Sequence, residues 1–362
     1  MTGQQQRIVV LGAGYAGLSA ARRLASKARD AAITVVDTRA EFVERVRLHQ
    51  AAAGQSIGRW DLRELLERKG AEFVRARVTE LDPDAKQVRL DGEWTIGYDT
   101  LVYALGSAAD RTSVPGVADY AHSVATPEDV RALPAGPVIV VGAGSTGIEL
   151  AAELAESHRD SQVTLLGSEE PGGWLSARAV EHIRSGLTAL GVEIRSGVKV
   201  AEVLPGGVRL VDGTVVPAAA VVWTAGFTVP ALARRAGLAV DEQGRIRTDE
   251  TLRSVSHPDI YAAGDAALID GPGGRPLRMA CATALPTGSY VARAIVTRAR
   301  GTEPEPMTFR YHLQCISLGR RDAVIQFLDA DDTPATRVLR GRTGAWVKER
   351  IVRFAGSAAG MR

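Results

Sequence analysis

Residues 7–17 read R-I-V-V-L-G-A-G-Y-A-G, an apolar run that ends in three spaced glycines. The apolar run predicts a short buried strand, and residues 18–28, rich in Ala, Leu and Arg, predict a helix. We expect Gly12 to form the tight turn, Gly14 to let the backbone approach a pyrophosphate, and Gly17 to let helix and strand pack closely.

The start of the predicted helix has free N–H groups that can hold a pyrophosphate, and the helix dipole favours negative charge there. We place Tyr15 and Ala16, in the turn just before the helix, in this site. A second apolar strand, residues 33–36, ends at Asp37, whose carboxylate can accept hydrogen bonds from ribose hydroxyls. We place Thr38 in the same site. Spaced glycines alone often mark ordinary turns, but strand, turn, helix, strand and acid together indicate dinucleotide binding.

The same pattern occurs a second time. Residues 137–141 are an apolar run that leads into G-A-G-S-T-G, followed by a predicted helix at 148–158 and a strand at 162–166. The chain therefore contains two nucleotide-binding half-folds. The residues of the second turn that we expect to contact a nucleotide are Gly142, Gly144, Ser145, Thr146 and Gly147.

The second half-fold lacks the acid. Counting twenty residues beyond Gly147, the interval that separates Gly17 from Asp37, leads to Gly167, and Ser168 follows as a candidate nucleotide contact. Without a carboxylate opposite the ribose, a 2′-phosphate is not repelled. The pattern predicts NAD(P)H with NADPH slightly favoured, and the alternative is that the next acid folds back onto a 2′-hydroxyl.

Composition excludes several classes of protein. The chain has 362 residues, 45% of them hydrophobic, which is enough for two substantial cores. A net charge of +2 without a long Lys/Arg block does not suggest nucleic acid, and no apolar run reaches the length of a membrane span. The polar residues 1–6 leave no room for a signal peptide, and two separated cysteines suit a reducing compartment. We expect a cytoplasmic protein without a metal site.

The segment between the first acid and the next strand is polar. Residues 38–50 pass near the cofactor in a flavin-dinucleotide domain, so Arg39 or Arg45 can meet phosphate. His49 either faces the ring of that cofactor or is a structural histidine with its hydrogen bonds satisfied. We expect the following strand to end at Val78, beside the adenine.

Three later apolar runs end in glycine, at Gly106, Gly226 and Gly264, and each glycine lets the backbone approach a ligand closely. The last glycine precedes Asp265, whose carboxylate can accept a hydrogen bond from a sugar-alcohol hydroxyl such as that of ribitol. The alternative is an ordinary turn at a strand end.

Five ordered motifs now stand together: G-A-G-Y-A-G, A-L-G-S, G-A-G-S-T-G-I-E, T-A-G and Y-A-A-G-D. The set resembles the two-dinucleotide flavoproteins of the pyridine nucleotide-disulfide oxidoreductase superfamily, over about residues 7–300. The resemblance implies that Asp265 binds the ribitol of FAD. It also implies that Glu149 lies near the junction of nicotinamide and flavin, as the candidate catalytic residue.

The resemblance further implies an α/β fold with two Rossmann-like dinucleotide-binding domains, the second inserted in the first, and a small C-terminal α+β domain. The expected divisions are residues 1–111 and 243–302 for FAD, 112–242 for NAD(P)H, and 303–362 for the C-terminal domain.

One family feature is missing, because residues 38–70 contain no redox cysteine pair. The chain therefore resembles the dithiol-free type II NADH dehydrogenases and the apoptosis-inducing-factor-like quinone reductases. In that family a helix begins against the flavin pyrimidine, which implies contacts from Thr283 and Ala284. We interpret Cys281 as a small packing residue.

The C-terminal segment predicts strands near 307–317 and 323–327 and a helix over residues 344–354 (G-A-W-V-K-E-R-I-V-R-F), from Gly344 to Phe354. Trp346 and Phe354 share its apolar side, and Lys348 belongs to the polar remainder. The helix either covers the flavin domain or makes weak contact with a membrane surface. Residues 356–362 are expected to form a frayed tail.

These features lead to one main hypothesis: an FAD-dependent NAD(P)H oxidoreductase that passes electrons to a quinone-like acceptor without a redox disulfide. The alternatives are a reductase of a ferredoxin-like protein and a nucleotide-binding redox sensor. The sequence is compatible with a monomer or a homodimer.

Overall fold

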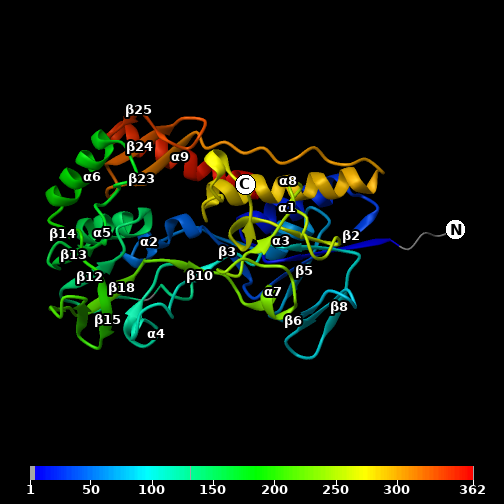
Figure 1. Ribbon diagram of the computed structural model, residues 1–362, viewed down its shortest axis with the longest axis horizontal. Coiled ribbons are helices and arrows are strands. Elements are labelled where there is room, and N and C mark those ends of the chain that lie inside the picture. Colours follow the sequence, from blue (N-terminus) through cyan, green and yellow to red (C-terminus); the bar gives the residue numbers. More distant parts are fainter. Residues whose placement is uncertain (1–4, 131, 362) are drawn as a thin grey trace.

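The computed structural model describes residues 5–130 and 132–361, and it shows two units with parallel sheets and a smaller C-terminal unit (Figure 1). The first sheet has five strands, all parallel to their neighbours, and β1 and β2 are largely buried, as strands covered on both faces require. Their order is β21 (Ile260–Ala262), β9 (Thr100–Tyr103), β1 (Gln6–Leu11), β2 (Ala31–Asp37) and β5 (Glu72–Arg75).

Two helices cover one face of this sheet. Helix α1 (Tyr15–Lys27) begins directly after the first glycine turn, and α8 (Cys281–Ala299) packs along it. The approach is close at Gly288, where a Cβ would lie 2.0 Å from the carbonyl oxygen of Ala16. Only glycine permits this contact, so α8 is held against the start of α1.

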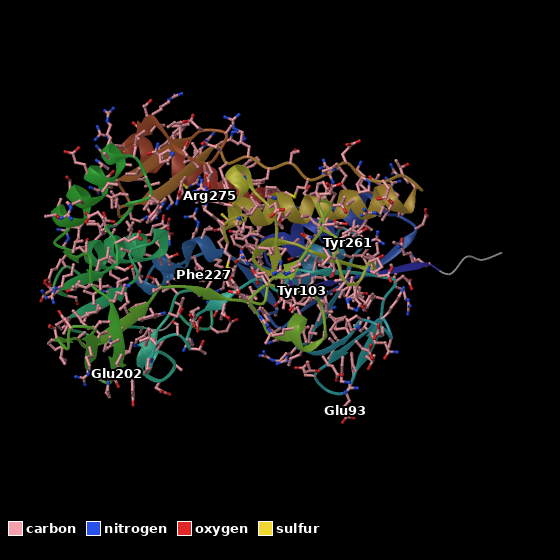
Figure 2. The ribbon with its side chains drawn as sticks, in the orientation of Figure 1. Glu93, Tyr103, Glu202, Phe227, Tyr261 and Arg275 are labelled. Atoms are coloured by element: carbon pink, nitrogen blue, oxygen red, sulfur yellow. The ribbon has the colours of Figure 1, made fainter. Side chains whose placement is uncertain are left out.

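The second sheet repeats the design. Its parallel strands are ordered β11 (Ala121–His122), β18 (Ala220–Trp223), β12 (Val138–Val141), β13 (Val163–Leu166) and β14 (Glu193–Arg195). Helices α5 (Ser145–Ser157) and α6 (Ala177–Ala189) follow β12 and β13. Figure 2 labels Phe227 on β19 (Phe227–Thr228), which pairs with β10 (Ala108–Ala109) between the two units.

Each unit also carries a three-stranded antiparallel meander. The expected strand 71–78 is wrong in its second half, because β5 ends at Arg75 and Val78 begins a new strand. The meanders are β6 (Val78–Asp82), β7 (Gln87–Leu90) and β8 (Thr95–Gly97), then β15 (Val200–Leu204), β16 (Gly207–Leu210) and β17 (Val215–Pro217).

The polar segment after β2 crosses to the second unit. It forms β3 (Glu41–Val43), η1 (Arg45–Arg47), α2 (Leu48–Ala52), β4 (Arg59–Asp61) and α3 (Leu62–Glu67). Leu48 and Ala52 are buried in the second unit's core, against α5, so η1 lies between the two units. Asp61 caps α3 by accepting a hydrogen bond from the Glu64 N–H at 2.8 Å.

The C-terminal unit consists of β23 (Leu313–Ser317), β24 (Ala323–Leu328), β25 (Pro334–Leu339) and α9 (Gly341–Ala359). Strand β25 was not anticipated, and α9 is longer than expected at both ends. The expectation of a frayed tail is wrong for the described residues, because Ala359 and Met361 are buried; Arg362 lies outside them.

The described residues include no helix that is both long and apolar enough to cross a membrane. Short elements complete the chain: α4 (Val117–Tyr120), α7 (Leu232–Arg235), β20 (Ile246–Arg247), β22 (Ala267–Leu268), η2 (Gly264–Ala266) and η3 (Pro272–Gly274). Because β21 joins the first sheet after the second sheet is complete, the second core interrupts the first, and the expected fold class is confirmed.

Candidate functional site

Both glycine turns open into one cavity of about 1410 Å³, here called the large cavity. Residues from both units, from the segment after β2, from the start of α8 and from α9 form its walls. The residues expected from the sequence that line it are Gly12, Gly14, Tyr15, Ala16, Asp37, Thr38, Arg45, Val78, Gly106, Gly144, Ser145, Thr146, Glu149, Gly226, Gly264, Asp265 and Ala284.

The first turn has the geometry that its spacing predicts. Gly12 has a φ of +94°, and a Cβ there would lie 2.4 Å from the Ala104 carbonyl oxygen. A Cβ at Gly14 would meet nothing within 4 Å, so the backbone there is open to the large cavity. Asp37 is buried and accepts hydrogen bonds from the N–H groups of Ala13, at 2.7 Å, and Arg39, at 2.9 Å.

A second polar group joins three distant segments. Asp265 Oδ2 accepts hydrogen bonds from Ser107 Oγ at 2.6 Å and from Arg45 Nη1 at 3.3 Å. Arg45 Nη1 also lies 3.1 Å from Ser107 Oγ, and its guanidinium lies over the Phe227 ring at 5.2 Å. Burial lowers the pKa of Arg45, and the Asp265 carboxylate opposes that effect.

Five expected contacts do not line the large cavity. Gly17 and Gly147 instead sit under their own turns, where a Cβ would lie 1.8 Å from the carbonyl oxygen of Gly12 or Gly142. Thr283 is buried in the first turn of α8, and its hydroxyl donates to the Ala280 carbonyl at 2.7 Å. The others are Gly142, which packs against Thr224, and the exposed Ser168.

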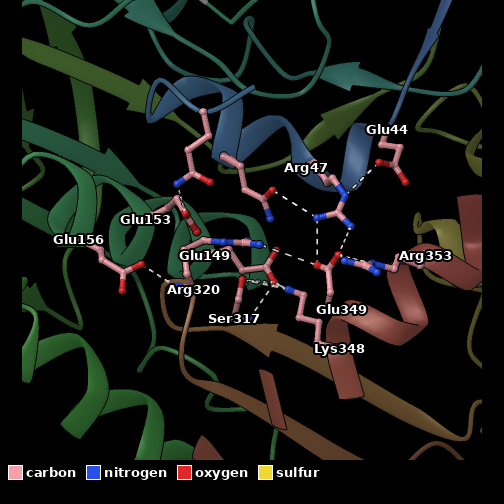
Figure 3. A network of polar contacts seen from close by, with 12 residues as sticks. Glu44, Arg47, Glu149, Glu153, Glu156, Ser317, Arg320, Lys348, Glu349 and Arg353 are labelled. Atoms are coloured by element: carbon pink, nitrogen blue, oxygen red, sulfur yellow. Dashed lines mark hydrogen bonds and ion pairs between the residues drawn. The ribbon is translucent and has the colours of Figure 1, made fainter. Parts of the chain in front are cut away.

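Glu149 is the centre of a buried network (Figure 3). Its Oε1 atom accepts hydrogen bonds from the Ser317 N–H at 2.9 Å and from Ser317 Oγ at 3.2 Å. Lys348 forms an ion pair with the same oxygen and donates to Ser317 Oγ at 3.0 Å. Helix α5, strand β23 and helix α9 thus meet at one carboxylate on the cavity wall.

The basic groups in this network are strongly desolvated. Burial, followed by the charge of Arg47, lowers the pKa of Lys348 to about 7, and the Glu349 carboxylate opposes that fall. His49 is 4% exposed, and its Nδ1 atom lies 3.9 Å from Glu149 Oε2. Burial, followed by the charge of Lys348, lowers the pKa of His49 well below its ordinary value, so His49 is neutral. Among the described residues its Nε2 atom has no hydrogen-bond partner, and the ring lines the large cavity.

Sequence reasoning missed three of these residues. It assigned Lys348 to the polar side of its helix, whereas the structure buries that side chain against Glu149. Ser107 stood inside the quoted A-L-G-S motif, where the glycine drew attention. Nothing in the local sequence marks Ser317, because its role depends on the pairing of β23 with β24.

Two nucleotide turns that face one cavity define the class of the two-dinucleotide flavoprotein reductases. The family model of the pyridine nucleotide-disulphide oxidoreductases matches residues 6–288, and the chain belongs to this family.

Three relatives are similar in sequence to this chain over most of its length. An NADH dehydrogenase-like protein of Mycobacterium tuberculosis is 34% identical over 354 residues, which cover 88% of this chain and 87% of the relative. A demethylphylloquinone reductase of Synechocystis is 28% identical (91% and 88% covered), and a type II NADH:quinone oxidoreductase of Staphylococcus haemolyticus is 27% identical (90% of each).

The likeness to a solved structure concerns the fold and not the function. NDH2 from Plasmodium falciparum, determined in complex with NADH, superposes with a TM-score of 0.82 over 99% of this chain and 98% of its own, at 14% identity.

Proposed function

We propose that the protein is an FAD-dependent NAD(P)H oxidoreductase that reduces a quinone. The observation that carries this proposal is the shared cavity, with nucleotide turns from both units and a buried Glu149–Lys348 pair on its wall. The names of the relatives, which include NADH:quinone oxidoreductase and demethylphylloquinone reductase, support the same acceptor class.

The residues present suit FAD in the first unit. Helix α1 begins without a side-chain cap and without an acidic residue in its first turn, which leaves its N–H groups and its dipole for a pyrophosphate. The Arg45–Ser107–Asp265 group offers donors and an acceptor for a polyhydroxyl chain. We assign FAD to residues 1–111 and 243–302, NAD(P)H to 112–242, and a covering role to 303–362.

FAD held by these residues would supply the chemistry, namely acceptance of a hydride equivalent from NAD(P)H and transfer of two electrons to a quinone. Reduction of a quinone to a quinol by NAD(P)H takes up one proton from solution. Glu149 and Lys348 can supply it, because both line the large cavity and share Ser317 as a hydrogen-bond partner. His49 lies on the same wall and is neutral, so it carries no proton to donate from a charged ring.

Nucleotide preference rests on the end of β13. We propose that NADPH is accepted at least as well as NADH, because the strand is followed by Gly167 and Ser168 rather than by an acid. Glu169, the acid that directly follows Ser168, is exposed, and the next acid, Glu170, is held by Arg184 at 2.8 and 2.6 Å and by Ser196 at 2.8 Å. Steady-state kinetics with each nucleotide test this part of the proposal. A value of kcat/KM that is much higher for NADH than for NADPH contradicts it.

We also propose that the protein works in the cytoplasm, with its C-terminal helix in weak contact with a membrane surface. Four exposed residues follow one another at four-residue intervals on α9 and form what is here called the α9 stripe: Arg342, Trp346, Arg350 and Phe354. Alternating cations and aromatic rings suit the interface between lipid headgroups and acyl chains. Phe354, 73% exposed, also lines the large cavity, so a quinone can enter beside it.

Stopped-flow absorbance tests the function. Purified protein with FAD is mixed anaerobically with NADPH or NADH, and the reduced protein is then mixed with quinones of different tail length. Rapid bleaching followed by rapid reoxidation with a quinone is the expected result. Reoxidation only by an iron–sulfur protein, or a reduced state that no quinone reoxidises, contradicts it.

A further inference from the structure

A second, smaller cavity of about 290 Å³ lies on the outer side of Lys348, which lines both cavities. Residues of η1, of the turn between β23 and β24, and of α9 form its walls. This space is here called the basic cavity, because its charged lining residues are five cations and two carboxylates: Arg47, Arg320, Arg321, Arg342, Lys348, Asp322 and Glu349.

Both carboxylates are already engaged. Asp322 contacts His182 Nε2 at 2.9 and 3.0 Å. Glu349 Oε1 accepts hydrogen bonds from Arg47 Nη2 and from Arg353 Nε, each at 2.9 Å, and Oε2 accepts one from Arg47 Nη1 at 3.1 Å. The acids of the basic cavity therefore leave its remaining positive charge uncompensated.

The uncompensated charge belongs mainly to Arg321 and Arg342. Within residues 5–130 and 132–361, neither guanidinium forms a hydrogen bond or an ion pair with the protein, and both are exposed. They come from two different elements, the turn before β24 and the first turn of α9, and line one cavity. Two unpaired planar guanidinium groups offer parallel N–H donors to a tetrahedral oxyanion.

We propose that the basic cavity binds a phosphate group through Arg321 and Arg342. The group has two possible sources: the headgroup of an anionic phospholipid or a soluble phosphate compound. The lipid source rests on the membrane contact proposed above, because Arg342 and Trp346 belong both to the α9 stripe and to the lining of the basic cavity. The stripe thus connects the basic cavity to the mouth of the large cavity at Phe354.

Calorimetric titration with inorganic phosphate tests the site. The oxidised, FAD-loaded full chain is first saturated with NAD⁺, so that the nucleotide turns are occupied, and sodium chloride of equal ionic strength is the blank. The test variant is Arg321→Gln/Arg342→Gln. The control is Arg337→Gln, which changes an exposed arginine of β25 that lines neither cavity and lies outside the α9 stripe. We expect the double variant to lose about tenfold or more in phosphate affinity and the control to keep it.

Vesicle sedimentation identifies the source. The same three proteins are mixed with phosphatidylcholine vesicles, with or without phosphatidylglycerol. Binding that requires phosphatidylglycerol, falls in the double variant and is displaced by inorganic phosphate supports the lipid headgroup. Phosphate binding that is lost in the double variant, without any preference for phosphatidylglycerol, supports a soluble phosphate compound.

The proposal is overturned if phosphate gives no heat beyond the chloride blank, or if the double variant binds phosphate as tightly as the unchanged protein. Neither measurement uses electron transfer. Failure of the quinone reaction therefore leaves this test intact, and failure of this test leaves the quinone reaction intact.

Discussion

Glu149 is the single residue on which the proposed quinone reaction depends most. The change Glu149→Gln keeps the size of the side chain and its bond to the Ser317 N–H but removes the proton carrier. We expect reoxidation of the reduced protein by a quinone to slow roughly a hundredfold, the scale of general acid–base catalysis. Stopped-flow measurement of both half-reactions checks this, and reduction by NAD(P)H should keep its rate.

A matched control lies on the same helix. Glu156 accepts a hydrogen bond from the Arg320 N–H, and it does not line the large cavity. Glu156→Gln should leave reoxidation unchanged. Because removal of one partner of a buried ion pair costs about 3–5 kcal/mol, Glu149→Gln should also lower Tm, and Glu149→Gln/Lys348→Met should restore Tm without restoring the rate. Recovery of the rate in the double variant argues against a role in proton transfer.

Lys348 gives the reaction a pH dependence. Burial lowers its pKa from the ordinary value of 10.5, so the ammonium group loses its proton at a lower pH than an exposed lysine does. A proton donor acts only while protonated, so reoxidation by a quinone should slow as the pH rises through this lowered pKa. In Lys348→Met the rate should be low and should lack this fall. Identical pH profiles of the two proteins exclude Lys348 as the donor.

For single residues, the sequence predicted the backbone conformation better than the environment of the side chains. The roles of Gly12, Gly14 and Gly17 follow from spacing alone, because a tight turn between a strand and a helix has few solutions. Lys348 was assigned to the wrong environment because its helix pattern shows polarity but not the carboxylate that neutralises it. That carboxylate, Glu149, is 199 residues away in the chain.

Among the elements, the contact of α1 with α8 holds the first glycine turn in place. Gly288→Ala would put a Cβ 2.0 Å from the Ala16 carbonyl oxygen, and neither helix backbone can yield easily. We expect a loss of about 1–3 kcal/mol in the free energy of unfolding, together with weaker retention of FAD, as α1 moves. Thermal unfolding and the absorbance of the gel-filtered protein measure both effects.

Gly206→Ala is the control for this change, since a Cβ there would meet nothing within 4 Å. It should leave both Tm and FAD content unchanged. If Gly288→Ala behaves like Gly206→Ala, the close contact between α1 and α8 does not hold the turn.

Periodicity predicted the presence of elements better than their boundaries. The helix expected at 148–158 corresponds to α5, which begins three residues earlier, whereas the strand expected over 71–78 is broken, because Val74, Ala76 and Val78 continue an alternation that the backbone does not. Strand β25 was not predicted, because three of its six residues are exposed, none is buried, and the segment lacks an apolar pattern. Its order comes from pairing with β24.

At the level of the whole molecule, the α9 stripe should determine contact with a membrane. Trp346 is 63% exposed and Phe354 73% exposed, and burial of two aromatic rings in an interface is worth about tenfold or more in partitioning. Trp346→Ala/Phe354→Ala should therefore reduce sedimentation with lipid vesicles by that factor, while FAD content and Tm stay the same.

Trp94 provides the control, because it is 67% exposed in the turn between β7 and β8, away from the C-terminal unit. Trp94→Ala should not change vesicle binding. Equal losses in the two variants indicate nonspecific adhesion by exposed rings.

The insertion of one core in the other was expected through the family resemblance. The network around Glu149 was not expected, because it depends on how α5, β23 and α9 meet after folding (Figure 3). A short motif predicts the conformation of its own backbone. The network around Glu149 instead combines side chains from several segments that are distant in the sequence.

The late arrival of β21 also bears on biosynthesis. Strand β9 (Thr100–Tyr103) keeps an open edge until Ile260–Ala262 leaves the ribosome, whereas every strand of the second sheet has emerged by Trp223. The inner unit therefore finishes before its host, and nascent chains pass through an interval in which β9 lacks one of its two neighbours. Since Asp265 follows β21, flavin capture belongs to the last stage of maturation, and a shortage of riboflavin should affect an almost complete polypeptide.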